Sequence, residues 1–285
     1  MTTEDGFVVI DKPSGMTSHD VVAKLRKKFA TKRVGHAGTL DPMATGVLVV
    51  GINNATKFLQ YITEGKKRYL ATIRLGQSTT TDDREGDIIE SRDCGSVSDE
   101  AIRDSLSSQV GTIMQKPSKV SAIKIAGERA YDLVRQGKDV DIPAREVTIH
   151  SLEILSINRN EFLDIDIDVE CSAGTYIRSI ARDLGEALGV GGHLTKLRRT
   201  VVAPFYERDC QSMEDCEILP LVPSISQIMP TRSIDLVEKS ELSFGRALSK
   251  SHFEGPGVAI SPDGVIAAII ENRDYGAQPL AVFNS

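Results

Sequence analysis

The sequence predicts an α+β fold, in which strands dominate and helices pack against them. Two observations support this prediction. Apolar and polar residues alternate in several segments, as in half-buried strands, and amphipathic segments with a helical period lie between them. With 285 residues the chain can form one large domain, or one large and one small domain.

Apolar runs bounded by turn residues mark the expected strands. The strands expected before Pro230 span residues 7–10, 47–51, 68–76, 151–158 and 162–171. The last two form a hairpin. In its second strand acidic residues alternate with apolar ones over positions 164–170. We therefore expect these acidic side chains on one exposed face of the sheet rather than in a metal site.

Amphipathic segments mark the expected helices. They span residues 19–29, 55–61, 99–106 and 177–188. Thr17 or Ser18 can cap the first helix, because a hydroxyl oxygen accepts a hydrogen bond from a free N–H group of the first turn. Gly189 ends the last helix, since glycine readily adopts the left-handed conformation that follows many helices.

The residues beyond Pro230 predict a second, smaller unit. A helix is expected over residues 231–242. The strands expected after it span residues 257–261 and 265–271, followed by a short strand that Phe283 closes. Pro262, Asp263 and Gly264 separate the first two of these strands and form a hairpin turn signal.

Composition excludes several function classes. The first five residues are acidic with no apolar run behind them, and no apolar stretch reaches membrane-spanning length, so we expect neither a secretory signal nor a membrane anchor. The four cysteines show no C-x-x-C pair, and the chain has no P-loop and no dinucleotide fingerprint. We therefore expect no metal, no cofactor and a reducing cytoplasm.

The net charge of −6 is unevenly distributed, and this matters for a nucleic-acid partner. Residues 1–80 carry 12 Lys/Arg and 6 Asp/Glu, whereas residues 200–285 carry 6 and 12. The densest basic cluster consists of Lys24, Arg26, Lys27, Lys28, Lys32 and Arg33. Such a run alone is usually a solvated helix face, but local basic patches bind phosphates whatever the total charge.

The segment that follows this cluster, residues 33–46, is the most informative about function. It places Asp41 in a Gly- and Pro-rich loop, five residues after His36 and just before the buried strand at 47–51. A carboxylate held on a loop against a rigid strand can act as a nucleophile or a general base. An isolated Asp-Pro pair, however, is more often a turn whose carboxylate caps local N–H groups.

Five motifs in order favour the catalytic interpretation. They are D-K-P-S-G-M-T-S at 11–18, G-H-A-G-T-L-D-P-M-A-T-G-V-L at 35–48, K-K-R-Y at 66–69, C-S-A-G-T-Y-I-R at 171–178 and L-R-R-T at 197–200. Together they resemble the motifs of the TruB family, the tRNA pseudouridine-55 synthases of the stand-alone bacterial type. The resemblance extends from about residue 6 to about residue 205.

The resemblance implies roles for individual residues. Asp41 is the expected nucleophile, Arg178 pairs with it and keeps its pKa low, and Tyr69 contacts the target base. His36 is the candidate to occupy the place that a flipped base leaves, although it could instead hydrogen-bond within its loop. The other expected substrate-binding residues are Lys12, Lys66, Lys67, Lys124, Leu197 and Arg199.

Some of these expectations carry more detail. Lys12 is expected to support the wall of the site or a phosphate. Leu197 is expected to pack on the target base or, at the end of an L-R-R helix, to belong to the core. Lys196, Arg198 and Arg199 are expected to contact phosphates.

The resemblance also implies an architecture. Residues 1–229 would form a catalytic domain with a mixed, mainly antiparallel sheet flanked by helices, the pseudouridine synthase fold. An RNA-gripping insertion is expected at about 112–146, where Ser118 and Val120 replace the usual Pro and Tyr. Residues 230–285 would form a small, β-rich, PUA-like barrel.

The expected substrate is the T-stem-loop of tRNA, modified without a cofactor, a metal or a protein partner by a monomer. Two alternatives remain. A guide-RNA-dependent relative would share the superfamily, although His36 favours the stand-alone enzyme. A non-catalytic tRNA-folding chaperone would use the same basic patches while Asp41 did no chemistry.

Overall fold

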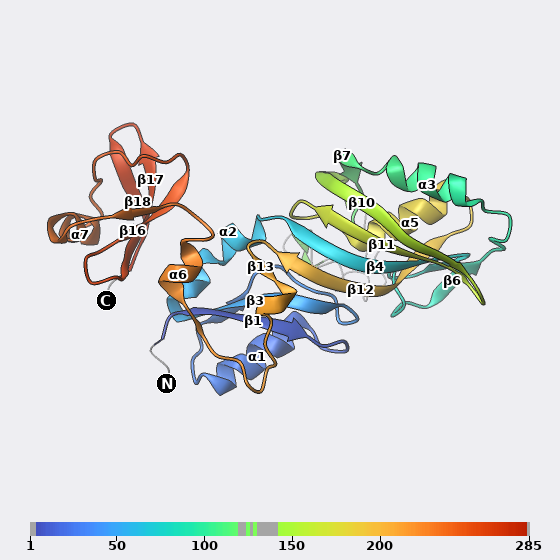
Figure 1. Ribbon diagram of the computed structural model, residues 1–285, viewed down its shortest axis with the longest axis horizontal. Coiled ribbons are helices and arrows are strands. Elements are labelled where there is room, and N and C mark those ends of the chain that lie inside the picture. Colours follow the sequence, from blue (N-terminus) through green and yellow to red (C-terminus); the bar gives the residue numbers. More distant parts are fainter. Residues whose placement is uncertain (1–3, 119–123, 126–127, 130–141, 284–285) are drawn as a thin grey trace.

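The computed structural model describes residues 4–118, 124–125, 128–129 and 142–283 (Figure 1). They form a large sheet flanked by helices and a smaller four-stranded sheet at the C-terminal end. The predicted α+β fold is therefore confirmed. Within the described residues, none of the helices is both long and apolar enough to cross a membrane.

The large sheet is mainly antiparallel. Its strands, in spatial order, are β14 (Leu219–Pro220), β1 (Gly6–Lys12), β3 (Thr45–Ile52), β12 (Gly192–Val202), β4 (Lys67–Leu75), β11 (Leu163–Cys171), β10 (Arg145–Arg159) and β7 (Gly111–Gln115). Two short strands pair off this path, β2 (Val34–His36) with β3 and β13 (Phe205–Tyr206) with β12.

One parallel contact joins the two halves of this sheet. Among the described strands of the sheet, β3 and β12 alone run parallel, and they pair through just two positions, Thr45 with Arg198 and Gly46 with Arg199. The chain enters β3 directly from the loop that carries Asp41, residues 37–44, which we call the Asp41 loop. The sequence therefore places Asp41 where the two antiparallel halves meet.

Helices cover the sheet and confirm most predicted positions. They are α1 (Ser18–Lys28), η1 (Asn53–Phe58), α2 (Leu59–Thr63), α3 (Asp99–Ser107), α5 (Ile177–Ala187), η2 (Glu207–Asp209) and α6 (Leu221–Ile225). Thr17 caps α1, since its hydroxyl oxygen accepts a hydrogen bond from the N–H group of Asp20 at 3.1 Å. Gly189 follows α5 with φ +72°, as the sequence predicts.

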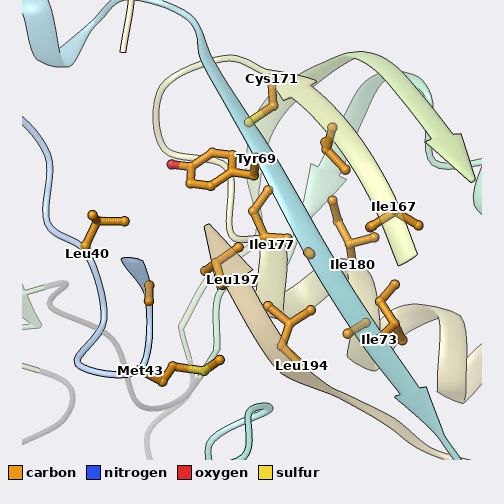
Figure 2. Packing of buried hydrophobic residues seen from close by; sticks show 14 of the residues in the cluster. Leu40, Met43, Tyr69, Ile73, Ile167, Cys171, Ile177, Ile180, Leu194 and Leu197 are labelled. Carbon is orange, nitrogen blue, oxygen red and sulfur yellow. The ribbon is translucent and has the colours of Figure 1, made fainter. Parts of the chain in front are cut away.

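The main hydrophobic core holds the Asp41 loop in place. Leu40 and Met43 are each 3 % exposed and belong to the same apolar cluster as strand residues of β4 and β12. In Figure 2 they lie beside Tyr69, Leu194 and Leu197. An apolar side chain on each side of Asp41 thus anchors the loop, because burial of each removes apolar surface from water.

The acidic residues of β11 are half-buried rather than fully exposed. Asp164, Asp166, Asp168 and Glu170 pair across to β4, with Arg74, Thr72, Arg68 and Lys66 respectively. Arg74 lies directly opposite Asp164 in the strand register, whereas Arg68 is opposite Glu170 and reaches diagonally to Asp168. Among the described residues, no His, Cys, Asp and Glu side chains gather in a group that could hold a metal ion.

The small sheet corrects part of the C-terminal prediction. Its order is β15 (Thr231–Ser233), β16 (Pro256–Ile260), β17 (Ile266–Arg273) and β18 (Gly276–Val282). Residues 231–233 are thus a strand rather than the start of a helix. The helix, α7 (Leu236–Ser243), begins after Asp235, which caps it by accepting a hydrogen bond from Glu238. The hydrogen-bonded order of the described strands is an open sheet, not a closed barrel.

Residues 197–200 correct a second prediction. They lie inside β12 rather than at a helix end. Thr195, Thr200, Val201 and Val202 make this segment rich in β-branched residues, which favour strands. Side chains alternate along a strand, so Leu197 and Arg199 are buried on one face while Arg198 lies on the other.

Smaller hairpins complete the fold. β5 (Gln77–Thr79) pairs with β6 (Ile88–Ser91), and the loop between them holds Asp82 and Asp83. β8 (Lys124–Ile125) pairs with β9 (Glu128–Arg129) within the predicted insertion. The rest of residues 119–141, including Val120, and the side chain of Lys124 lie outside the part of the chain that is described.

Candidate active site

A cavity of about 300 Å³ opens beside the Asp41 loop. Its lining comes from five parts of the fold: the Asp41 loop, the end of α2, β4, the segment 172–178 that leads into α5, and β12. The lining residues with polar side chains, together with Leu197, are Thr39, Asp41, Thr63, Lys67, Tyr69, Ser172, Thr175, Tyr176, Arg178 and Arg199. The structure therefore brings together Asp41, Tyr69, Arg178 and Leu197, which lie far apart in the sequence.

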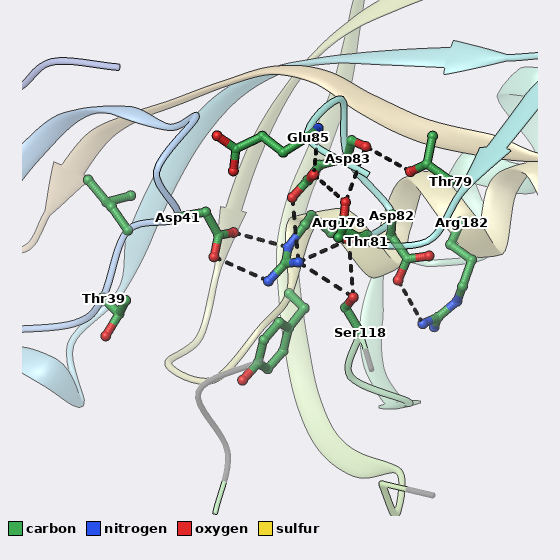
Figure 3. Close-up of polar contacts among 12 residues, drawn as sticks. Thr39, Asp41, Thr79, Thr81, Asp82, Asp83, Glu85, Ser118, Arg178 and Arg182 are labelled. Atoms are coloured by element: carbon green, nitrogen blue, oxygen red, sulfur yellow. Dashed lines mark hydrogen bonds and ion pairs between the residues drawn. The ribbon is translucent and has the colours of Figure 1, made fainter. Parts of the chain in front are cut away.

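Asp41 and Arg178 form a two-pronged ion pair at this cavity (Figure 3). The Nε atom of Arg178 lies 3.0 Å from Oδ2 of Asp41, and its Nη2 atom donates to Oδ1 at 3.2 Å. The side chain of Arg178 is 5 % exposed and that of Asp41 is 31 % exposed. The guanidinium is thus fixed, while the carboxylate keeps an edge open to the cavity.

A second carboxylate lies behind Arg178. Asp83 is 3 % exposed, and its Oδ2 atom lies 3.5 Å from Nη1 of Arg178. The hydroxyl of Thr81 and the backbone N–H group of Glu85 both donate to Asp83, at 2.5 and 3.0 Å. The carbonyl oxygen of Thr81 accepts from Arg178 at 2.9 Å. Each edge of the guanidinium therefore has a partner, as a buried cation requires.

Burial dominates the electrostatics of Asp41. Loss of solvent raises the pKa of its carboxyl above the ordinary value of 3.8, and the nearby Asp83 adds to this increase. Arg178 lowers the pKa of Asp41, but it offsets only part of the effect of burial. Arg178 therefore acts on this pKa in the expected direction, but the net shift is upward because burial outweighs the ion pair.

Lys12 and Arg199, two of the expected substrate-binding residues, hold the Asp41 loop through hydrogen bonds to backbone carbonyl oxygens. Lys12 is fully buried and donates from Nζ to the carbonyl oxygens of Pro13, Met16 and Pro42, at 2.9, 2.6 and 3.2 Å. In this geometry Lys12 supports the Asp41 loop, and its three hydrogen bonds leave no free face for a phosphate. Burial lowers the pKa of the Lys12 ammonium to about 8.

The position of Arg199 likewise differs from the prediction that it contacts a phosphate. It is 1 % exposed and donates from Nε to the carbonyl oxygen of Val47 at 2.8 Å and from Nη2 to that of Gly38 at 3.1 Å. It therefore joins β12 to β3 and to the start of the Asp41 loop rather than facing a phosphate. Gly46 permits this approach, since a Cβ atom there would lie 2.2 Å from the carbonyl oxygen of Arg199.

Tyr69 is 9 % exposed and lies beside Arg199 in the register of β4 and β12. Burial raises the pKa of its phenol above 10, so the hydroxyl stays protonated near neutral pH. The group can offer an aromatic face and an O–H group to a bound base. Leu197, 7 % exposed, supplies an apolar wall of the same cavity.

Two family models match the chain. The N-terminal domain of the TruB family pseudouridylate synthases matches residues 26–177, and the C-terminal domain of tRNA pseudouridylate synthase B matches residues 178–219. The chain belongs to the TruB family.

Relatives of this TruB chain cover almost its full length. A protein called tRNA pseudouridine synthase B from Corynebacterium efficiens is 52 % identical over 274 residues, covering 94 % of this chain and 92 % of the relative. A protein of the same name from Thermobifida fusca is 46 % identical over 288 residues, covering 98 % of each chain. In the crystal structure of a Cbf5-Nop10-Gar1 complex, one chain is 25 % identical with a TM-score of 0.72, covering 97 % of this chain and 84 % of that chain.

Two expected substrate-binding residues of this TruB chain, His36 and Lys67, lie elsewhere or are otherwise engaged. His36 ends β2, does not line the cavity, and has its Nδ1 atom buried without a hydrogen-bond partner among the described residues. Burial lowers the pKa of His36 to about 4, so the imidazole is neutral. Lys67 is 5 % exposed and donates to the carbonyl oxygens of Thr63 and Gly65.

The more exposed basic residues differ in the ion pairs that they form with acidic side chains. Lys66 lies 3.3 Å from Glu170 on the surface. Arg198 pairs with Asp11 at 3.0 Å and Glu207 at 2.5 Å, which corrects the expectation that it is available to phosphates. Lys196 is exposed.

Sequence reasoning missed Asp83 and Gln115. The sequence signal available for Asp83 was the pair of acidic residues that follows three threonines at 79–81. Gln115 gave no signal of its own.

Proposed function

We propose that this chain converts the uridine at position 55 of the tRNA T-loop to pseudouridine, with Asp41 as the reacting carboxylate. The observation that carries the proposal is the forked ion pair between Asp41 and Arg178 at the mouth of a cavity walled by Tyr69 and Leu197. Relatives that are 46–52 % identical and called tRNA pseudouridine synthase B support tRNA as the substrate.

The reaction is an isomerisation that this site can perform with its own side chains. The bond between N1 of uracil and C1′ of ribose breaks, the base turns, and C5 joins C1′ while the C5 hydrogen leaves as a proton and N1 gains one. Asp41 adds to C6 of the base or to C1′ of the sugar, or acts as a base during bond cleavage. Arg178 keeps the carboxylate aimed at the cavity during these steps.

The remaining side chains hold and orient the base. The ring of Tyr69 stacks on the flipped uracil, and its protonated hydroxyl handles a proton. Leu197 covers the base from another side. Lys12 and Arg199 keep the Asp41 loop rigid, so that the carboxylate does not move away when RNA binds.

His36 and the exposed basic residues serve the RNA around the base. His36 fills the gap in the RNA stack, because a neutral imidazole can stack on unpaired bases. Lys24, Lys27, Lys32 and Arg33 are exposed on α1 and just after it, and they contact phosphates. Lys66 and the insertion with Lys124 grip the same RNA.

The domain roles belong to the same proposal. Residues 1–229 form the catalytic domain, and residues 230–285 form a PUA-like unit whose acidic composition argues against strong nonspecific RNA binding. We expect a monomer in the cytoplasm that needs no protein partner. Of the two alternatives, the guide-RNA-dependent relative is disfavoured. The chain is 46–52 % identical to two proteins called tRNA pseudouridine synthase B but 25 % identical to the matching chain of the Cbf5-Nop10-Gar1 complex.

Release of hydrogen from C5 tests the proposal directly. Purified protein is incubated with an unmodified T-stem-loop RNA that carries tritium at C5 of the target uridine, without guide RNA or other proteins. We expect the wild type to release tritium to water and Asp41→Asn to release none while still binding RNA. Asp99→Asn, on the exposed face of α3, is the matched control and should behave as the wild type.

Two outcomes would contradict the proposal. Absence of tritium release from wild-type protein that binds the RNA would exclude the stand-alone enzyme and favour the guide-dependent or chaperone alternative. Normal release by Asp41→Asn would show that Asp41 is not the reacting group.

A further inference from the structure

Gln115 makes an unusual pair of contacts for a side chain at the end of an edge strand. It is the last residue of β7 and is 1 % exposed. Its Nε2 atom donates to the carbonyl oxygen of Tyr176 at 3.1 Å, and its Oε1 atom accepts from the backbone N–H group of Tyr176 at 2.8 Å. The side-chain amide of Gln115 thus bonds to both the carbonyl oxygen and the N–H group of Tyr176, which fixes the position and orientation of the Tyr176 backbone.

Tyr176 is the residue from which α5 starts. It is the N-cap of the helix, and its own side chain makes no capping hydrogen bond. Arg178 follows two residues later, in the first turn of α5. The direction in which its guanidinium leaves the helix therefore depends on where the N-cap backbone is held, and Gln115 holds that backbone.

The residues after Gln115 reinforce this attachment. The carbonyl oxygen of Lys116 accepts from Oγ of Ser179 at 3.0 Å and from Nη2 of Arg182 at 2.8 Å, both on α5. Ser118 is fully buried and donates to the carbonyl oxygen of Thr81 at 3.2 Å.

Ser118 and Arg178 also meet. Nη1 of Arg178 donates to Oγ of Ser118 at 3.5 Å and to the carbonyl oxygen of Thr81 at 2.9 Å (Figure 3). Residues 115–118 therefore contact the start of α5, its first two turns, and the loop that holds Asp83.

We propose that Gln115 is a positioning residue for the reaction, which sets the start of α5 so that Arg178 meets Asp41 in the forked geometry. This inference rests on the proposed function. It assigns to Gln115 no contact with RNA: the residue acts through Tyr176 and Arg178. A displacement of about 1 Å at a reacting group costs up to about 100-fold in rate, so even a small shift of the helix start matters.

Substitution of Gln115 separates positioning from RNA binding. We expect Gln115→Ala to lower the single-turnover rate of tritium release at saturating T-stem-loop RNA by about tenfold or more, with the Kd for the RNA changed by less than about twofold. Gln115→Glu keeps the acceptor for the Tyr176 N–H group but replaces the donor with an oxygen that faces the Tyr176 carbonyl oxygen, so its rate should also fall below that of the wild type.

Gln109→Ala is the matched control. Gln109 also bonds to α5, through one hydrogen bond of 3.4 Å from Nε2 to the carbonyl oxygen of Ile180, but it does not touch Tyr176. We expect this variant to react at the wild-type rate. Thermal unfolding of all three variants shows that they are folded. If Gln115→Ala does not fold, the single-turnover rate of Gln115→Glu is compared with that of the wild type instead.

The pH profile supplies a readout that a purely structural role would not change. The titratable groups that face Asp41 are Lys12, Tyr69, Asp83, Glu85, Arg178 and Arg199. Arg178 is the first of these that lowers the pKa of Asp41, so its displacement in Gln115→Ala should move the acid limb of the rate to higher pH. Gln109→Ala should leave that limb in place.

Three results would overturn the inference: a wild-type single-turnover rate in folded Gln115→Ala, a loss confined to RNA binding with a normal rate at saturation, or an equal loss in Gln109→Ala. Failure of the wild type to release tritium would instead count against the proposed function and is recognisable before any variant is compared.

Discussion

At the scale of single residues, the site is organised by one guanidinium between two carboxylates. Arg178 contacts Asp41 on one edge and Asp83 on another, and its side chain is 5 % exposed. A buried Arg with a single carboxylate would leave some of its five donors unpaired, at a cost in free energy. Asp83 and the carbonyl oxygen of Thr81 satisfy them, so that Asp41 can stay partly open to the cavity.

The pKa of Asp41 predicts the acid limb of activity. Burial raises this pKa above 3.8, and the proposed function requires an ionised carboxylate that adds to the substrate or accepts a proton. The rate should therefore be constant above the raised pKa and should fall as the pH decreases through it. A pH profile of the single-turnover rate on the T-stem-loop measures this limb.

A variant separates Asp41 from His36, whose pKa also lies in the acid range. His36 has a pKa of about 4, so its protonation could also appear at low pH. His36→Phe keeps an aromatic ring and removes this titration. If the acid limb belongs to Asp41 it persists in the variant, and its disappearance would assign it to His36.

The sequence could predict part of this site and not the rest. Asp41, Tyr69 and Arg178 were identifiable because each lies in a distinctive motif. The partners of Arg199 and Lys67 could not be predicted from the sequence. A long basic side chain can extend into water or bond to a buried carbonyl oxygen, and the surrounding fold decides which. Asp83 and Gln115 act through residues distant in sequence, and no local pattern reveals such contacts.

At the scale of elements, β4 and β11 are joined by a ladder of charged pairs. Arg74 donates to both oxygens of Asp164 at 2.8 Å, and its guanidinium lies 3.7 Å from the centre of the Phe162 ring. Arg68 makes a similar fork to Asp168, but its side chain is 46 % exposed, compared with 23 % for Arg74. The two pairs share a geometry and differ in exposure.

This difference predicts unequal contributions to stability. Arg74→Gln should lower the free energy of unfolding by about 1–2 kcal/mol, since it loses a partly shielded fork and the contact with Phe162. Arg68→Gln should cost at most about 0.5 kcal/mol, because exposed pairs are weakened by solvent and salt. Urea unfolding of both variants measures the two values. Equal costs would mean that exposure does not control the strength of this ladder.

The elements themselves were largely predictable, and the errors share a cause. The strands at 7–10 and 47–51 and the helices at 19–29 and 99–106 have clear periods, and the structure confirms them. The segments at 197–200 and 231–233 are short, and their mixed apolar and basic residues fit a strand or a helix end alike. Pairing with β4 in one case and β16 in the other makes them strands.

At the scale of the whole molecule, the small C-terminal sheet and the cavity beside Asp41 lie in different parts of the fold. The small sheet meets the body through a shared apolar cluster that includes Val258, Ile266 and Ile269. Phe283 packs against this cluster, and its ring stacks on Phe58 of η1 with centroids 5.4 Å apart. Lys57 lies 4.1 Å from the centre of the Phe283 ring and donates to the carbonyl oxygen of Val282 at 2.9 Å. None of these residues lines the cavity beside Asp41.

Phe283→Ala should therefore separate stability from catalysis. Loss of a half-buried ring that stacks on Phe58 should lower the free energy of unfolding by roughly 1–3 kcal/mol, while the single-turnover rate on the T-stem-loop stays within about twofold of the wild type. Tyr275→Ala, which removes a 92 % exposed ring from the same sheet, is the control and should change neither quantity. A rate loss in Phe283→Ala that matches its loss of stability would show instead that the sheet and the cavity are energetically coupled, and the acidic C-terminal unit would then be part of the catalytic machinery.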